Sequence, residues 1–185
     1  YLRKIAKKNS VSIRSYEIES YIDIVGKDDV VIAFSQSGET ADTLEAIEAF
    51  KKNKAYICSV INMPGSTLSR MSDIFFMSNA GSEICVASTK VFTSQISFGY
   101  LLAKSLINEY SEAKKELSIL SQNLGAFFNE KTFSNIKKIS KLLKNKEHFF
   151  ILGKGQNYHI AQEGALKIKE ISYKHFEGFA AGELK

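Results

Sequence analysis

Apolar residues in the first half of the chain fall into short continuous runs separated by amphipathic segments. The runs lie at 30–34 (VVIAF), 56–61 (YICSVI) and 74–77 (IFFM). Runs that are apolar throughout predict strands buried on both faces, as in a parallel sheet. Between the first two runs, Leu44, Ile47 and Phe50 recur every three residues and predict a helix over 41–52. Strand, helix and strand at this spacing predict a βαβ unit and an α/β fold.

The same pattern predicts the remaining elements and a division of the chain. Before residue 125 it predicts a strand-like segment at 11–14, a short helix capped by Ser66 and ending at Arg70, and helices over 90–108 and 112–124. After a candidate boundary at 125–130 it predicts a helix over 133–143, a strand over 148–152, a loop over 153–157 and a helix over 160–173. We therefore expect one subdomain over 1–125 and the incomplete start of a second over 126–185.

Composition and charge narrow the class of protein. The 185 residues are 44% hydrophobic, and no run of 18 apolar residues predicts a membrane span. The net charge of +5 permits an anionic ligand, but the lysine cluster at 137–146 fits a solvated helix face, and no nucleic-acid motif accompanies it. Cys58, Cys85 and three scattered histidines do not have zinc-ligand spacing. We expect a cytoplasmic protein that has no metal or cofactor and binds neither nucleic acid nor membranes.

The segment Ser35–Thr40 follows the strand at 30–34 and precedes a helix. Ligands of open parallel sheets bind beyond the carboxyl ends of the strands, and a helix N-terminus attracts phosphate. The segment reads Ser35, Gln36, Ser37, Gly38, Glu39 and Thr40, so it offers three hydroxyls, one amide and a glycine that allows close approach. A plain helix cap by Ser37 or Thr40 explains the same residues equally well. The segment lacks the Gly-Lys-Ser/Thr of a Walker A loop.

Three ionisable residues share one face of the helix predicted over 160–173. Glu163, Lys167 and Glu170 are spaced four and three apart, whereas Lys169 points the other way. Spacing alone favours a salt-bridged surface stripe over a catalytic cluster.

Three stretches resemble one known family in the expected order. Residues 35–43 (SQSGETADT) are similar to the phosphosugar-binding loop of SIS (sugar isomerase) domains, in the longer form typical of the glucosamine-6-phosphate synthase family. Residues 83–90 (EICVASTK), and residues 163–173 with 180–185 (EGALKIKEISY and AAGELK), resemble two further segments of that family. The resemblance is weakest from Asn108 to Glu147. It implies a three-layer αβα, flavodoxin-like parallel sheet with the start of a second SIS subdomain.

The resemblance also implies roles for individual residues. The family makes glucosamine 6-phosphate from fructose 6-phosphate and glutamine-derived ammonia. The residue matching Glu170 moves a proton between C1 and C2 of the open-chain sugar, Lys167 matches a member of the same catalytic cluster, and Glu163 matches a supporting member. The resemblance assigns substrate contacts to Ser35, Gln36, Ser37, Thr40, Val86, Ala87 and Ser88.

Several parts of the family enzyme are expected outside this chain. They are an N-terminal glutaminase domain, the first isomerase strand, a ring-opening histidine contributed by the other subunit of a homodimer, and a Schiff-base lysine in the C-terminal tail. His175 is not at the position of that histidine. We therefore expect the 185 residues alone to be inactive. The alternatives are another SIS enzyme, such as a deglycase or a flagellar-sugar homologue, and a non-catalytic SIS sensor of sugar phosphates.

Overall fold

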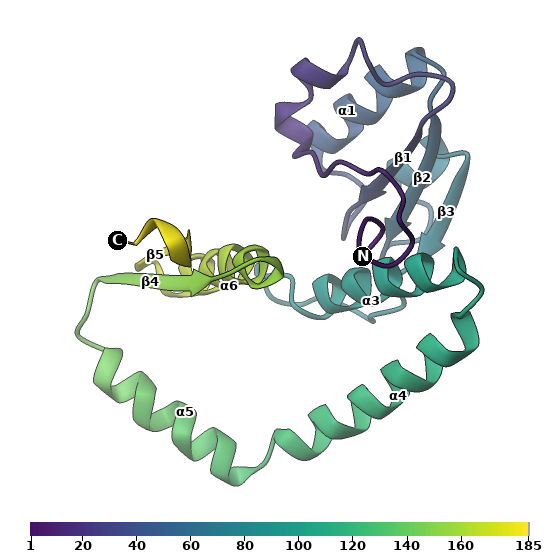
Figure 1. Cartoon of the computed structure of the whole chain (residues 1–185). Coiled ribbons are helices and arrows are strands. Elements are labelled where there is room, and N and C mark those ends of the chain that lie inside the picture. Colours follow the sequence, from purple (N-terminus) through teal and green to yellow (C-terminus); the bar gives the residue numbers. More distant parts are fainter. Residues whose placement is uncertain (185) are drawn as a thin grey trace. The chain divides into compact units, whose positions relative to one another are not determined.

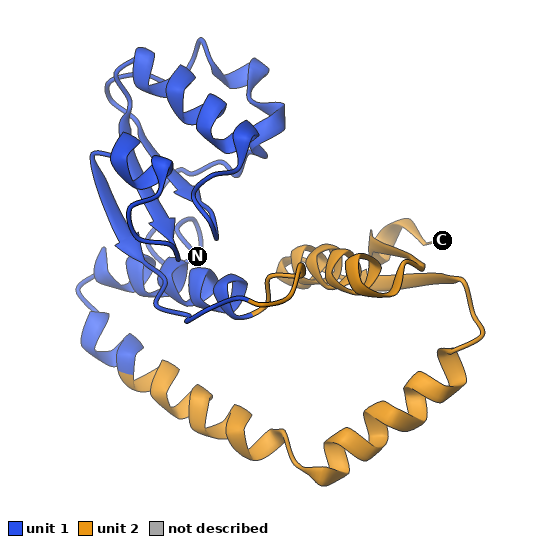
Figure 2. Cartoon of the chain, turned by 180° about the vertical axis from the view of Figure 1, so that it is seen from behind, with its two compact units in different colours: residues 1–83, 90–114 blue, residues 84–89, 115–185 orange. Residues whose placement is uncertain are grey.

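A computed structural model describes residues 1–184, which form two compact units (Figure 2). Unit 1 comprises residues 1–83 and 90–114, and unit 2 comprises residues 84–89 together with the chain from 115 onward. None of the helices within residues 1–184 has the length and apolarity that crossing a bilayer requires.

Unit 1 contains a three-stranded parallel sheet with the order β1-β2-β3 (Figure 1). Its elements are two short 3₁₀ helices at Ser15–Glu17 and Glu19–Tyr21, β1 (Val30–Phe34), α1 (Ala41–Lys52), β2 (Tyr56–Ile61), α2 (Thr67–Met71), β3 (Ile74–Met77) and α3 (Lys90–Ser105). The register pairs Val30 with Tyr56 and Cys58 with Ile74. The predicted parallel α/β fold is confirmed, and so are all three strands and α1. Burial on both faces holds for β2 alone among these strands, because most of β3 and both ends of β1 are exposed.

The core of unit 1 explains why the apolar runs became strands. Ile57 and Ile61 of the central strand β2 are fully buried, and they pack with Ile47 and Phe50 of α1. The periodic apolar residues of α1 therefore face the sheet, as their spacing predicts. Leu68 of α2 is also fully buried in this cluster.

Two predictions in unit 1 need correction. The prediction of a strand-like segment at 11–14 is wrong, because these residues pair with no strand and Val11 is exposed. Two β-branched residues do not make a strand when no neighbouring strand offers partners for the backbone groups. The helix predicted over 90–108 ends earlier, at Ser105. The short helix after Ser66 is confirmed, and the Ser66 hydroxyl accepts a hydrogen bond from the backbone N–H of Ser69.

The second half of the chain is mainly helical. Its elements are α4 (Tyr110–Phe127), α5 (Glu130–Leu143), β4 (His148–Gly153), α6 (Gln156–Ser172), β5 (His175–Ala180) and a 3₁₀ helix at Ala181–Glu183. Both α4 and α5 begin before the predicted positions, and the Asn129 side chain caps α5 by accepting from the Thr132 backbone N–H. The helix α6 begins at Gln156, four residues before the predicted start at 160.

Helix α6 packs on a two-stranded parallel sheet formed by β4 and β5. Ala161 and Ala165 are its buried residues. The close approach depends on Gly178 of β5, where an added Cβ would lie 2.6 Å from the Gln162 backbone. The rings of Phe149 and Phe176 stack across the two strands with centroids 4.3 Å apart. The strand β5 was not predicted from the sequence.

Candidate functional site

The segment Ser35–Thr40 forms a tight turn between β1 and α1. The backbone N–H of Ser35 donates to the Val60 carbonyl at 3.1 Å, which continues the sheet one residue beyond β1. The Ser35 hydroxyl accepts from the Gly38 N–H at 2.9 Å, and the Ser37 hydroxyl accepts from the Glu39 N–H at 3.1 Å. These two serine side chains therefore stabilise the turn itself.

Gly38 places the turn directly against the start of α2. Its φ of +69° is left-handed, and an added Cβ would lie 2.2 Å from the Ser66 hydroxyl oxygen. The Gly38 carbonyl accepts from the Leu68 N–H at 3.0 Å. A side chain at this position is excluded by both the backbone conformation and the contact.

Glu39 is the one acidic residue of the turn, and its carboxylate already has a partner. One of its oxygens accepts from the Thr67 N–H at 2.7 Å. This hydrogen bond, assisted by the charge of Arg70, lowers the pKa of Glu39 below its usual value. The carboxylate therefore holds the beginning of α2 beside the turn.

Thr40 differs from the two serines because its hydroxyl makes no capping hydrogen bond. The residue occupies the N-cap position of α1 and is exposed. Its carbonyl accepts from the Leu44 N–H at 3.0 Å, as in an ordinary first turn. The first backbone N–H groups of a helix have no partner within the helix. The amino end of α1 can therefore receive an anion, which would accept from these groups and from the Thr40 hydroxyl.

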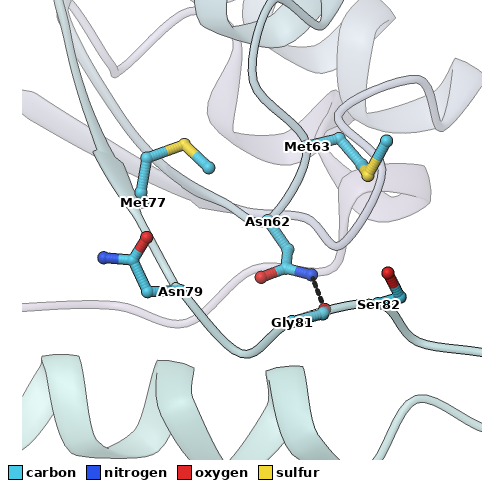
Figure 3. Close-up of a pocket in the computed structure, with 6 residues that line it drawn as sticks. All are labelled: Asn62, Met63, Met77, Asn79, Gly81 and Ser82. Atoms are coloured by element: carbon cyan, nitrogen blue, oxygen red, sulfur yellow. Dashed lines mark hydrogen bonds between the residues drawn. The ribbon is translucent and has the colours of Figure 1, made fainter.

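A pocket of about 380 Å³ lies at the carboxyl ends of β2 and β3 (Figure 3). It is lined by Asn62, Met63, Met77, Asn79, Gly81 and Ser82. The Asn62 backbone N–H donates to the Gln36 carbonyl at 3.1 Å, so the pocket adjoins the turn after β1. The sequence analysis did not predict these residues as part of a site. The position of Asn62 directly after a buried strand was the signal that could have indicated them.

The ionisable residues of α6 meet as their spacing predicts. The Lys167 ammonium lies 3.3 Å from a Glu163 carboxylate oxygen and 3.1 Å from a Glu170 carboxylate oxygen. The three side chains are only 20 to 29% exposed, whereas Lys169 is exposed. The arrangement is therefore a partly desolvated cluster of two carboxylates that share one cation.

Lys167 has a pKa above its usual value as the result of opposing effects. Partial burial acts to lower the pKa, but the hydrogen bond to Glu170 and the interactions with the Glu163 carboxylate outweigh it. The ammonium therefore remains charged at neutral pH. A fixed cation between two carboxylates can stabilise negative charge that develops on a nearby substrate.

The segment Val86–Ser88 has no regular secondary structure. Val86 is 87% exposed, Ala87 is fully buried and Ser88 is half-buried. The predicted site residues thus fall into three groups. The turn after β1 belongs to unit 1, whereas the segment at 86–88 and the cluster on α6 belong to unit 2. Within residues 1–184, no three His, Cys, Asp or Glu side chains gather as metal ligands.

Comparison with known proteins identifies related sequences over nearly the whole chain. The SIS domain family matches residues 1–105 and 142–185. The glutamine–fructose-6-phosphate aminotransferase (isomerizing) of Pyrobaculum aerophilum is 40% identical over 179 residues, which cover 95% of this chain and 30% of that protein. The corresponding protein of Francisella tularensis is 43% identical over 199 residues, which cover 100% of this chain and 31% of that protein. The chain therefore spans about 30% of the length of these relatives.

The structure also resembles a solved one. The C-terminal domain of glucosamine-fructose-6-phosphate aminotransferase from Francisella tularensis superposes with a TM-score of 0.84 at 39% sequence identity. The match covers 99% of this chain and 54% of that chain.

Proposed function

The chain belongs to the SIS domain family, and we propose that it is the sugar-phosphate isomerase portion of a glucosamine-6-phosphate synthase. Such an enzyme converts fructose 6-phosphate and glutamine-derived ammonia into glucosamine 6-phosphate. The related aminotransferases are about 40% identical to almost the whole chain, which supports this proposal.

The phosphate group of the substrate binds at the turn between β1 and α1. The unpaired N–H groups at the start of α1 donate to its oxygens, and the exposed Thr40 hydroxyl adds a further donor. Ser35 and Ser37 hold the turn in shape through their bonds to Gly38 and Glu39. Gln36 and the segment Val86–Ser88 complete the proposed substrate contacts.

Proton transfer between C1 and C2 of the open-chain sugar takes place at the cluster on α6. Glu170 accepts the proton from one carbon and returns it to the other, so one carboxylate serves first as base and then as acid. Lys167 stabilises the negative charge that develops on the enolate-like intermediate. Glu163 holds the Lys167 ammonium from the opposite side, at 3.3 Å.

The half-buried Glu163–Lys167–Glu170 cluster is the observation that carries this proposal. A sensor that only binds a sugar phosphate needs the turn after β1 but no base on α6. An exposed salt-bridged stripe, in contrast, would leave all three side chains in solvent. Two carboxylates that share a partly desolvated ammonium are better suited to proton chemistry.

The partners and compartment follow from the same proposal. We propose a homodimer, a glutaminase domain in the same polypeptide as the source of ammonia, and a cytoplasmic location. The names of the related enzymes support the role of glutamine, and their greater length leaves room for a further domain.

The test is a product assay on the protein expressed from its complete reading frame. We expect fructose 6-phosphate and glutamine to give glucosamine 6-phosphate, detected by mass spectrometry, and we expect Glu170→Gln to form it about 10²–10⁴-fold more slowly. A protein that binds fructose 6-phosphate but forms no aminated sugar would contradict the proposal and would favour a sensor.

A further inference from the structure

Asn62 connects two loops at the carboxyl edge of the sheet in unit 1. It follows β2 directly and is buried. Its backbone N–H donates to the Gln36 carbonyl at 3.1 Å, which ties it to the turn after β1. Because this bond uses only the backbone, it does not depend on the identity of the side chain.

The Asn62 side chain binds the loop that follows β3. Its Oδ1 accepts from the Ala80 N–H at 3.0 Å. Its Nδ2 donates to the Gly81 carbonyl at 2.7 Å, the bond drawn in Figure 3. The two bonds have opposite polarity, so they require both an acceptor and a donor at the end of a short side chain. Among the standard side chains only the carboxamide of asparagine meets both requirements at this length.

These bonds hold in place the loop that forms one wall of the pocket at the ends of β2 and β3. Gly81 and Ser82 line the pocket together with Asn62 itself (Figure 3). Beyond the pocket, the Ser82 carbonyl accepts from the Lys90 ammonium at 2.5 Å, and the Glu83 carboxylate accepts from the Val91 N–H at 3.1 Å. The loop is therefore fixed by Asn62 on one side and by the start of α3 on the other.

We infer that Asn62 is a positioning residue for sugar-phosphate binding. It holds the loop at 79–82 beside the turn after β1, so that the polar groups of the pocket wall face the hydroxylated carbon chain of a ligand whose phosphate lies at α1. Ligands of open parallel sheets occupy this carboxyl edge. The inference rests on the proposed function and adds a specific role for Asn62 and this loop.

The side-chain and backbone bonds of Asn62 can be tested separately. Asn62→Ala removes both bonds to residues 80 and 81 but keeps the backbone bond to Gln36. The variant should therefore bind inorganic phosphate like the native protein and should bind glucosamine 6-phosphate about ten-fold more weakly, as expected for lost hydrogen bonds in a binding site. The measurement is calorimetric titration of both ligands into the protein expressed from its complete reading frame.

Asn53→Ala is the matched control. The Asn53 amide also donates to a backbone carbonyl, that of Ile22, but Asn53 lies after α1 and before β2, at the opposite edge of the sheet. Asn53→Ala should lower the melting temperature without changing the ratio of the affinities for inorganic phosphate and glucosamine 6-phosphate. A residue with only a structural role would behave in this way, and the same result for Asn62→Ala would overturn the inference.

Amide hydrogen exchange of the native protein gives a second readout if Asn62→Ala does not fold. Glucosamine 6-phosphate should slow exchange at Ala80 more than inorganic phosphate does, because only the sugar reaches the pocket wall. Equal exchange with both ligands would overturn the inference. If the native protein binds neither ligand, the proposed function itself is wrong.

Discussion

The hydroxyl groups of the turn after β1 differ in the hydrogen bonds that they make within the protein. Those of Ser35 and Ser37 accept hydrogen bonds from the backbone of the turn, whereas the Thr40 hydroxyl makes no capping bond to α1. The sequence predicts all three as donors to a ligand, and this stays a prediction, because a hydroxyl that accepts a hydrogen bond can still donate one. The distinction depends on the backbone conformation at Gly38, whose φ is +69°, and a list of residue types does not contain it.

Replacing Ser37 and Thr40 together should weaken sugar-phosphate binding. The double variant Ser37→Ala with Thr40→Ala loses a hydroxyl that shapes the turn and one that is proposed to donate to the phosphate. We expect the affinity for fructose 6-phosphate to fall by about ten-fold to a hundred-fold, as for lost hydrogen bonds to a charged group. Calorimetric titration measures this change.

The control for this variant is Ser97→Ala on α3, whose hydroxyl donates to the Thr93 carbonyl in its own helix at 3.0 Å. It should leave the affinity unchanged. An unchanged affinity in the double variant would instead show that the turn does not bind the phosphate.

Glu39 makes the stability of unit 1 depend on pH in a defined direction. Because the hydrogen bond from Thr67 lowers its pKa in the folded protein, its contribution is present above the usual carboxyl pKa of about 4.3 and is lost as the pH falls through the lowered value. Glu39→Gln should therefore melt at a lower temperature than the native protein at pH 7. The difference should shrink as the pH approaches about 3.

Glu48→Gln on α1 serves as the comparison for this measurement. Glu48 forms an ion pair with Lys52 at 3.1 Å, but both side chains are well exposed, so the pair contributes little. Its melting temperature should follow the native one at every pH. A Glu39→Gln difference that stays constant with pH would contradict the role given to the Thr67 hydrogen bond.

At the scale of whole elements, strand prediction succeeded where the apolar run is continuous, even in β3, most of which is exposed. The strands β1, β2 and β3 are continuous apolar runs, and α1 has a regular apolar face, so their sequences alone predict them. The strand β5 was missed because its polar and apolar residues do not form such a run, and its backbone is ordered by pairing with β4. The segment at 11–14 failed for the converse reason, since it has the composition of a strand but no partner.

The start of α6 illustrates a second limit of prediction from the sequence. The helix begins at Gln156 after Gly155, which has a φ of +60° and supplies no side-chain cap. No cap residue therefore marked the true start, and the prediction placed it later. The error in the start does not affect the shared face of Glu163, Lys167 and Glu170. Their spacing along the helix alone places them on one face.

Lys167→Met tests the cluster on α6. The variant removes the cation between Glu163 and Glu170 and retains most of the side-chain volume. We expect the isomerase rate to fall by about 10²–10³-fold, the range for loss of one group that stabilises developing charge. Lys169→Met on the exposed side of the same helix should keep the native rate. Equal rates for the two variants would assign the cluster a structural role only.

At the scale of the whole molecule, each compact unit carries one part of the proposed chemistry. Unit 1 holds the turn at the amino end of α1 and the pocket beside it, and unit 2 holds the carboxylate–ammonium cluster. The sequence predicted both groups of residues through local motifs. It did not predict the pocket, because the bonds of Asn62 to Ala80 and Gly81 join segments that are distant in sequence.

Hydrogen exchange between the sugar and solvent tests the central claim most directly. The protein expressed from its complete reading frame is incubated with fructose 6-phosphate in D₂O, and deuterium at C1 and C2 is followed by NMR. We predict that the sugar incorporates deuterium in the presence of the native protein and in the presence of Lys169→Met. Glu170→Gln should bind the sugar phosphate, but the sugar should incorporate deuterium about 10²–10⁴-fold more slowly, as expected for loss of a general base. Incorporation at the native rate by Glu170→Gln would contradict the account.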